Sequence, residues 1–247
     1  MFFVIASCTK EKQNEVNKDV NLNKCINMSE EDPGLIHNEL LIKDMLKPGY
    51  FERTNLERIQ LAYDYYRDNN LTNLDFEEFA NTVDTTLCPD DISLLDLAMD
   101  VSQYYSFCDV FIEYAAQLNT LEFVDDDFYF EQLNMIADQV RTDDRLNDEE
   151  KYFLLGGISV AINSGMFWKY EYPMIMYNIS SMDKRNCPKY PRDPELSTSE
   201  NNQIRWADHK GWWRKGKSSR SCSAYSASAQ KHASIIRQHG GAYNEGD

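Results

Sequence analysis

The chain has 247 residues and a formal net charge of −16, because 41 Asp and Glu outnumber 25 Lys and Arg. Such an excess of carboxylates argues against nucleic acid as the main partner, since phosphate binding needs a basic face. Hydrophobic residues make up 42% of the chain, which is enough to bury a core and excludes a wholly disordered acidic protein. No apolar run approaches the roughly 18 to 20 residues that a membrane-spanning helix needs.

The first eight residues end in Ile5-Ala6-Ser7-Cys8, an apolar run followed by two small residues and a cysteine. Small residues before a cleavage site let a signal peptidase fit closely around the chain. The element resembles the lipobox of bacterial lipoproteins, in which the preceding peptide is removed and the cysteine thiol and new amino terminus are acylated. The resemblance implies a signal peptide over residues 1–8, lipid attachment at Cys8, and the membrane as a partner through the covalent lipid.

The element differs from the lipoprotein family in two respects. No Lys or Arg precedes the apolar run, and the run is about half the usual length. A start codon upstream of Met1 would account for both differences. The alternative interpretation is a buried amino-terminal strand in which Cys8 is a small hydrophobic residue.

Composition divides the rest of the chain into three parts. Residues 9–32 are rich in Lys, Asn, Glu and Asp, which predicts a flexible tether. Residues 33–190 are predicted to form an acidic helical domain, because apolar residues recur at helical spacing. Residues 191–247 are predicted to be a disordered basic tail. The expected fold is therefore all-α, an irregular bundle of five or six amphipathic helices between a disordered tether and a disordered tail.

The predicted helices follow one another through short polar loops. The first begins at the cap Asp32-Pro33, the second at a capping box from Thr54 to Glu57, and the last at the cap Asn147. A repeat of the capping box from Thr72 to Asp75 is expected to begin the third helix. Cys88-Pro89 is expected to begin the longest helix. Their approximate spans are residues 33–41, 55–68, 76–87, 89–118, 126–140 and 148–162.

The last 43 residues differ from the rest in charge. Residues 205–247 hold 8 Lys and Arg against 3 Asp and Glu, a net charge of +5, which leaves −21 for residues 1–204. With Trp206, Trp212 and Trp213, the segment could bind RNA or anionic lipid through charge and stacking. It could instead fold back on the acidic helices. A third interpretation is a frameshift, because Gly and Ala codons read out of frame give the Trp, Arg, Ser and Cys found between Gly211 and Cys222.

The segment Asp68–Phe79 resembles an EF-hand calcium loop. Asn73 replaces the glycine of the sharp turn, and Phe79 stands where the last carboxylate ligand belongs. A solvated acidic face is therefore preferred to a calcium site.

No other pattern nominates a metal, cofactor or catalytic site. The body cysteines lack CxxC spacing, although Cys88 and Cys108 could form a disulfide in an oxidising envelope. There is no GxSxG elbow. Gly156-Gly157 interrupts a helical pattern and predicts close helix packing.

Residues 37–41 form a His-Asn-x-x-Leu element. It resembles an element that follows the linker in uncharacterised helical lipoproteins and hypothetical proteins of Gram-negative bacteria. Those proteins often end in a Gly/Ala-rich tail after a Trp-Ala-Asp-like element, and Trp206-Ala207-Asp208 stands in that place. The function of that family is not established, so the resemblance implies a class and not an activity. From their hydrogen-bonding capacity, His37 and Asn38 are expected to cap the first helix or cross-link it to the bundle.

Together these features predict a lipoprotein of the bacterial cell envelope, with the outer membrane as its expected location. It is expected to act as a non-catalytic module that binds an envelope protein, without metal or cofactor and without nucleic acid. Two alternatives stay open: a small hydrolase whose carboxylates converge only in the fold, and a secreted helical effector.

Overall fold

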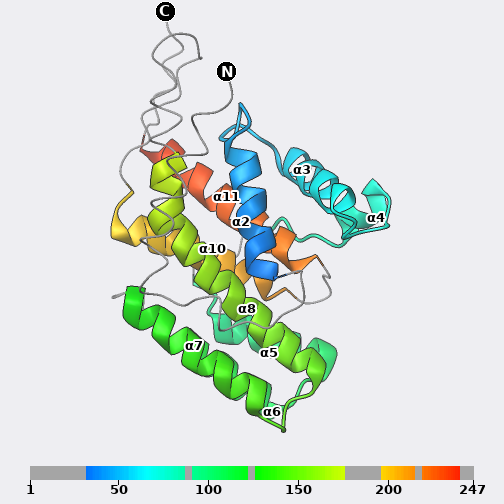
Figure 1. Ribbon diagram of the computed structural model, residues 1–247, viewed down its shortest axis with the longest axis vertical. Helices are drawn as coiled ribbons and strands as arrows, with labels where there is room; N and C mark the ends of the chain where they lie inside the picture. Colours follow the sequence, from blue (N-terminus) through cyan, green and yellow to red (C-terminus); the bar gives the residue numbers. More distant parts are fainter. Residues whose placement is uncertain (1–31, 87–90, 122–125, 176–195, 215–218, 240–247) are drawn as a thin grey trace, which may run out of the picture.

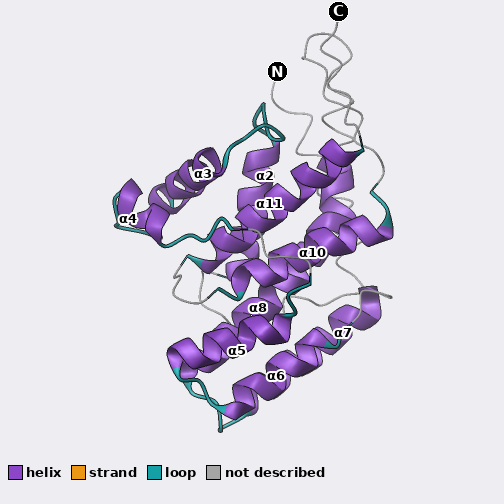
Figure 2. Cartoon of the chain, turned by 180° about the vertical axis from the view of Figure 1, so that it is seen from behind, coloured by secondary structure: helices purple, strands orange, loops and turns teal. Residues whose placement is uncertain are grey.

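The computed structural model describes residues 32–86, 91–121, 126–175, 196–214 and 219–239. These residues form nine α-helices and one π-helical segment, and no strand occurs among them (Figure 2). None of these helices is long and apolar enough to cross a membrane. In chain order the elements are α2 (Pro33–Met45), α3 (Asn55–Asp68), α4 (Phe76–Asn81), α5 (Leu94–Tyr105), α6 (Asp109–Asn119), α7 (Asp126–Thr142), α8 (Asp148–Met166), η2 (Phe167–Glu171), α10 (Thr198–Trp212) and α11 (Arg220–Gln238). The all-α prediction is confirmed.

Helix starts are set largely by local capping. Five helices, α3, α4, α5, α8 and α10, begin at a capping box in which the cap side chain and a carboxylate three residues later satisfy backbone amides reciprocally. The predicted caps Thr54, Asn147 and Asp32 are confirmed. For α4 the box lies three residues later than predicted, because Asp75 is the cap and Glu78 its partner.

The longest predicted helix is two helices. Ser106, at φ 60° and ψ 40°, ends α5 in the left-handed conformation, and α6 begins at Asp109. The break lets α6 pack along α5. It also buries Phe107 beside Phe111, with ring centroids 4.7 Å apart.

Helix α8 lies at the centre and packs against α2, α7 and α10. Figure 1 shows α5, α6 and α7 at the lower end of the molecule, with α3 and α4 at the side beyond α2. One hydrophobic cluster fills the space among α5, α6, α7 and α8, and it includes Trp212 and Trp213 of the α10 end. The second joins α2, α3, η2 and α11.

The prediction of a disordered tail from residue 191 is wrong for α10 and α11. These two helices pack against each other, α10 also contacts α8, and α11 also contacts α2. Trp212, Trp213 and Tyr225 are buried, so the tail supplies part of both hydrophobic clusters. The domain boundary at residue 190 is correspondingly wrong. The predicted signal peptide and all of the predicted tether except Asp32 lie outside the described residues.

The basic residues of this segment misled the composition argument because they pair inside the fold. Arg205 Nη1 lies 2.6 Å from Asp126 Oδ1 at the start of α7. Arg214 Nε lies 3.6 Å from Asp84 Oδ2. Both pairs join the basic segment to acidic elements, as expected if the segment folds back on the domain.

Candidate functional site

The His-Asn and Trp-Ala-Asp elements meet in the interior. Nε2 of His37 on α2 lies 2.6 Å from Oδ1 of Asp208 on α10. The other carboxylate oxygen accepts hydrogen bonds from the Ser164 hydroxyl of α8 and, at 3.0 Å, from Trp168 Nε1 of η2. All four side chains are buried to 1% exposure or less. The predicted cross-link of the first helix to the bundle is therefore confirmed, and Asp208 is its centre.

The hydrogen bonds of Asn38 orient the His37 ring. Asn38 Nδ2 donates to the carbonyl of Asn163 at 3.0 Å, which turns its amide oxygen toward His37 Nδ1 at 2.9 Å. Both ring nitrogens consequently face side-chain oxygens, one from Asn38 and one from Asp208.

A second polar junction lies at the start of α2. The Asp32 carboxylate caps this helix by accepting from Gly34 N at 2.8 Å, and it also accepts the Ser159 hydroxyl of α8. A Cβ on Gly34 would lie only 2.4 Å from the Ser159 carbonyl oxygen and the Asn163 side chain. Glycine is thus required here because α2 and α8 approach one another closely.

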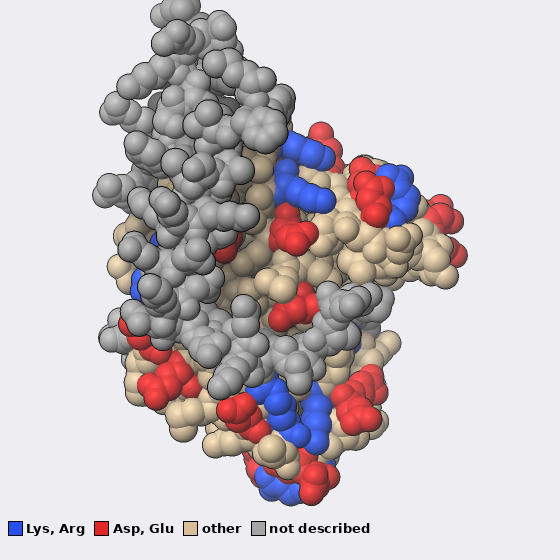
Figure 3. Space-filling view, viewed as in Figure 1, with Lys and Arg blue, Asp and Glu red and all other residues tan. Residues whose placement is uncertain are grey.

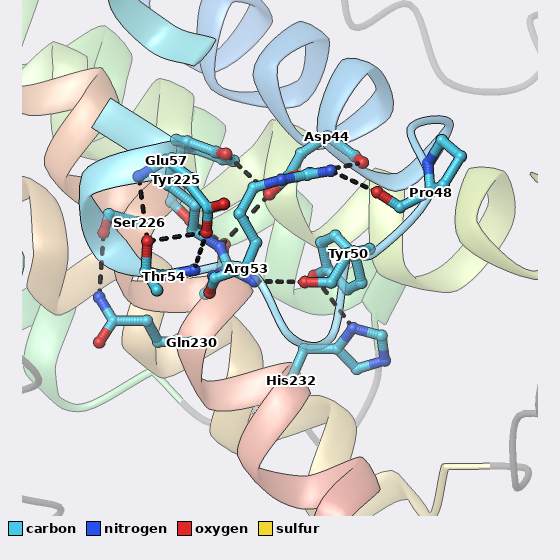
Figure 4. Close-up of polar contacts among 12 residues, drawn as sticks. Asp44, Pro48, Tyr50, Arg53, Thr54, Glu57, Tyr225, Ser226, Gln230 and His232 are labelled. Atoms are coloured by element: carbon cyan, nitrogen blue, oxygen red, sulfur yellow. Dashed lines mark hydrogen bonds and ion pairs between the residues drawn. The ribbon is translucent and has the colours of Figure 1, made fainter. Parts of the chain in front are cut away.

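A third junction surrounds Asp44 at the end of α2 (Figure 4). This fully buried carboxylate contacts the guanidinium of Arg53 and lies 3.3 Å from Nε of Arg58. It also accepts a hydrogen bond of 2.7 Å from the Tyr225 hydroxyl of α11. Arg58 donates to the Tyr50 carbonyl at 2.8 Å. The cluster fixes the loop between α2 and α3 against the last helix.

Two further histidines are buried in α10 and α11. His232 lies between the hydroxyls of Tyr50 and Tyr172, at 3.1 and 2.9 Å, and burial together with the nearby Arg58 charge lowers its pKa to about 3. Burial lowers the pKa of His209 to about 4, and its ring stacks on Trp206. Both rings are therefore neutral at neutral pH.

The geometry of Ser164, Asp208 and His37 differs from that of a nucleophilic triad. In such a triad the histidine lies between the serine and the carboxylate, so that it can take the serine proton. Here the carboxylate lies between the serine and the histidine, and none of the three is accessible. The arrangement can hold helices together, but it does not place the imidazole beside the hydroxyl, and all three side chains are enclosed.

The EF-hand-like segment forms helix caps and surface contacts. Asp75 and Glu78 are used in the capping box of α4, and Asp68 bonds with Arg67 at 3.0 Å. No group of three or more His, Cys, Asp or Glu in the described part of the chain could hold a metal ion. The segment's carboxylates therefore do not converge on a common point.

The cysteine predictions have separate outcomes. Cys8, the predicted lipid attachment site, lies outside the described residues, as do Cys25, Cys88 and Cys187. Cys108 is a free thiol, and the predicted Cys88–Cys108 disulfide involves a residue outside the described part of the chain.

Gly156 and Gly157 pack against the end of α10, as the helical pattern predicted. A Cβ on Gly156 would lie 2.1 Å from the Trp212 ring, and one on Gly157 would lie 3.0 Å from Trp213 Nε1. Trp212 Nε1 donates to the Phe153 carbonyl at 2.9 Å, which fixes the ring in this contact. The two glycines thus make room for indole rings and not for a phosphate.

Sequence reasoning missed most partners in these junctions. Ser164 and Trp168 stand in an apolar helical run, and Asp44, Arg58 and His232 belong to no motif. The one available signal is the pair of elements at His37 and Asp208, and the sequence does not indicate that the two elements are in contact. Comparison with known proteins adds no homologue, since no family model, curated protein or solved structure matches the chain.

Proposed function

We propose that the protein is a lipoprotein of the bacterial cell envelope, held at the membrane by acyl chains on Cys8. Its helical domain acts by binding another envelope component, not by catalysis. The observation that carries the proposal is the Ile5-Ala6-Ser7-Cys8 element at the start of a polar stretch. Twenty-three residues separate Cys8 from Asp32, where the described domain begins, and such a length spans at most about 80 Å.

The start of the domain is suited to attachment through its amino-terminal side. Asp32 both caps α2 and bonds to Ser159 on the central helix. Any force delivered along the preceding chain therefore reaches the α2–α8 contact first, and this contact is reinforced by the hydrogen bond from Asn38 on the same helix to the Asn163 carbonyl of α8.

The internal use of polar groups supports binding over catalysis. The buried Ser, His and Asp side chains satisfy one another across α2, α8 and α10, and their exchangeable groups are enclosed. The groups that a partner can reach are then the carboxylates of the acidic surface, and such a surface suits recognition of a partner.

Metabolic labelling with an alkyne analogue of palmitate tests the proposal. The gene is expressed in a Gram-negative host with its native upstream sequence, and membranes are separated into inner and outer fractions. We expect label on the wild-type chain in the outer-membrane fraction, loss of label in Cys8→Ala, and unchanged label in the matched variant Cys25→Ala. Absence of label, or label that persists in Cys8→Ala, would overturn the proposal.

A further inference from the structure

Negative charge gathers on the helices at the lower end of the molecule. From Asp68 through Val140 the sequence holds 17 Asp and Glu and no Lys or Arg. The fold places α5, α6 and α7 from this stretch together at one end (Figure 1). Acidic side chains are visible along the lower left of the space-filling view, where α7 lies, and Lys and Arg side chains lie beside them toward the middle of the lower end (Figure 3). A partner surface at this end must therefore tolerate or complement negative charge.

Helix α7 presents a defined stripe on its outer side. At 100° per residue, five outward residues fall within an arc of about 100°. They are Asp127, Phe128, Glu131, Met135 and Asp138, and all are exposed. The stripe is about 16 Å long at 1.5 Å per residue. The opposite side of α7 is buried against the core.

The stripe combines apolar area with carboxylates. Phe128 is 59% exposed and Met135 is 49% exposed, one heptad apart on the helix. Within the described part of the chain, Glu131 makes no ion pair, and Asp138 pairs only with Arg141 at 2.6 Å. Large exposed apolar side chains at this spacing match the anchor positions of a second amphipathic helix.

We propose that this α7 stripe docks a basic amphipathic helix of a partner protein. Two apolar residues seven positions apart in the partner contact Phe128 and Met135, and flanking Lys or Arg side chains face Asp127, Glu131 and Asp138. The inference deepens the proposed binding function and rests on it, because it names the partner chemistry of the same module.

Physical chemistry favours this occupant over others. An acidic stripe repels a second copy of itself and an anionic membrane, whereas it accelerates the encounter with a basic helix. Methionine adapts its shape to different apolar partners, which suits a docking surface more than a rigid core. Because the ion pairs are exposed, their contribution is screened by salt, while the apolar anchors persist.

Fluorescence anisotropy with a synthetic probe tests the proposal. The probe is a labelled helical peptide with two Leu residues seven positions apart and Lys on both flanks, and its control is a scrambled peptide of equal composition. The full-length chain carrying Cys8→Ala is used, so that failure of lipid attachment cannot affect the result. We expect the helical probe to bind, the scrambled probe to bind at least about tenfold more weakly, and added salt to weaken binding.

Variants locate the contact. Glu131→Lys and Met135→Gln should each weaken binding by about threefold or more, whereas Glu77→Lys on α4, which makes the same charge change at an exposed site, should have little effect. An equal effect of Glu77→Lys, equal binding of the scrambled probe, or no binding would overturn the proposal. So would sedimentation showing a dimer that Met135→Gln dissociates, since a second copy would then cover the stripe. Lipid labelling of Cys8 is unaffected by each of these outcomes.

Discussion

His37 Nε2 and Asp208 Oδ1 lie 2.6 Å apart although 171 positions separate the two residues in the sequence. Both side chains are fully buried, and Asp208 also holds Ser164 and Trp168. One carboxylate therefore joins α2, α8, η2 and α10. Through this carboxylate, the stability of α2 is coupled to that of α10, which packs against the last helix, α11.

A double-mutant cycle should measure that dependence. His37→Gln or Asp208→Asn alone disrupts a buried hydrogen bond and should cost about 1 to 3 kcal/mol of unfolding free energy. The double variant should cost less than the sum by about 1 to 3 kcal/mol, measured by urea unfolding. The half-exposed His239, which contacts Glu200, provides the control, and His239→Gln should cost at most about 1 kcal/mol. Additive losses would show that the two side chains are not coupled.

Packing between the central helix and α10 gives a second prediction. Gly156→Ala places a methyl group against the Trp212 ring and should destabilise the protein by about 1 to 3 kcal/mol. In a Trp212→Leu background the same change should cost clearly less, because the obstructing ring is gone. Thermal or urea unfolding of the four proteins measures this difference. An equal cost in both backgrounds would contradict the contact and, with it, the folded state of the tail.

The sequence was sufficient for helix content and for most helix starts, because caps such as Thr54, Asn147 and Asp32 act within one turn. The sequence was insufficient where tertiary contacts determine whether a segment is helical and where a helix ends. The break between α5 and α6 requires a residue in the left-handed conformation. Ser106 adopts this conformation, and the sequence has no glycine there that would predict it. Charge composition predicts a disordered tail because it does not include the acidic partners of the basic residues. Arg205 pairs with Asp126, which lies 79 residues away in the sequence. Amino-acid composition holds no information about which distant residues pair.

The candidate site was predicted only in part. Periodicity indicated packing at Gly156-Gly157, and hydrogen-bonding capacity indicated a cross-link through His37. The identity of the partners depends on how α8 and α10 cross, and a single sequence holds no such information. Ser164 therefore looked like any serine in an apolar helix.

Buried histidines should make stability depend on pH. The pKa values of His209 and His232 are about 4 and about 3 in the fold, below the ordinary value of 6.5. Between pH 6.5 and about 4 the unfolded chain binds more protons, so stability is full above pH 6.5 and falls as the pH is lowered. The loss is about 1.4 kcal/mol per pH unit for each histidine.

Urea unfolding between pH 6.5 and 4.5 measures this slope above the range where most carboxylates titrate. His209→Leu should reduce the slope by about half, because one of the two buried rings no longer takes up a proton on unfolding. A slope unchanged in His209→Leu would show that His209 is accessible to protons in the fold.

The acidic surface should make stability depend on salt. Self-repulsion among the carboxylates of α4 to α7 should weaken with sodium chloride, and most of the gain in melting temperature should be reached near about 0.15 M, where the Debye length is about 8 Å. Calcium at constant ionic strength should add little, because Asp75 and Glu78 already serve as a helix cap. Thermal melts of the full chain are required, since α10 and α11 belong to the core. A rise of several degrees specific to calcium would reveal a bound ion.

The lipid anchor is the central claim, and intact-mass spectrometry of the protein extracted from membranes tests it most directly. The account predicts a mature chain that begins at Cys8 and carries acyl chains on the thiol and on the new amino terminus, with cleavage and acylation both lost in Cys8→Ala. A membrane-extracted chain that retains Ser7 before an unmodified Cys8 would contradict it.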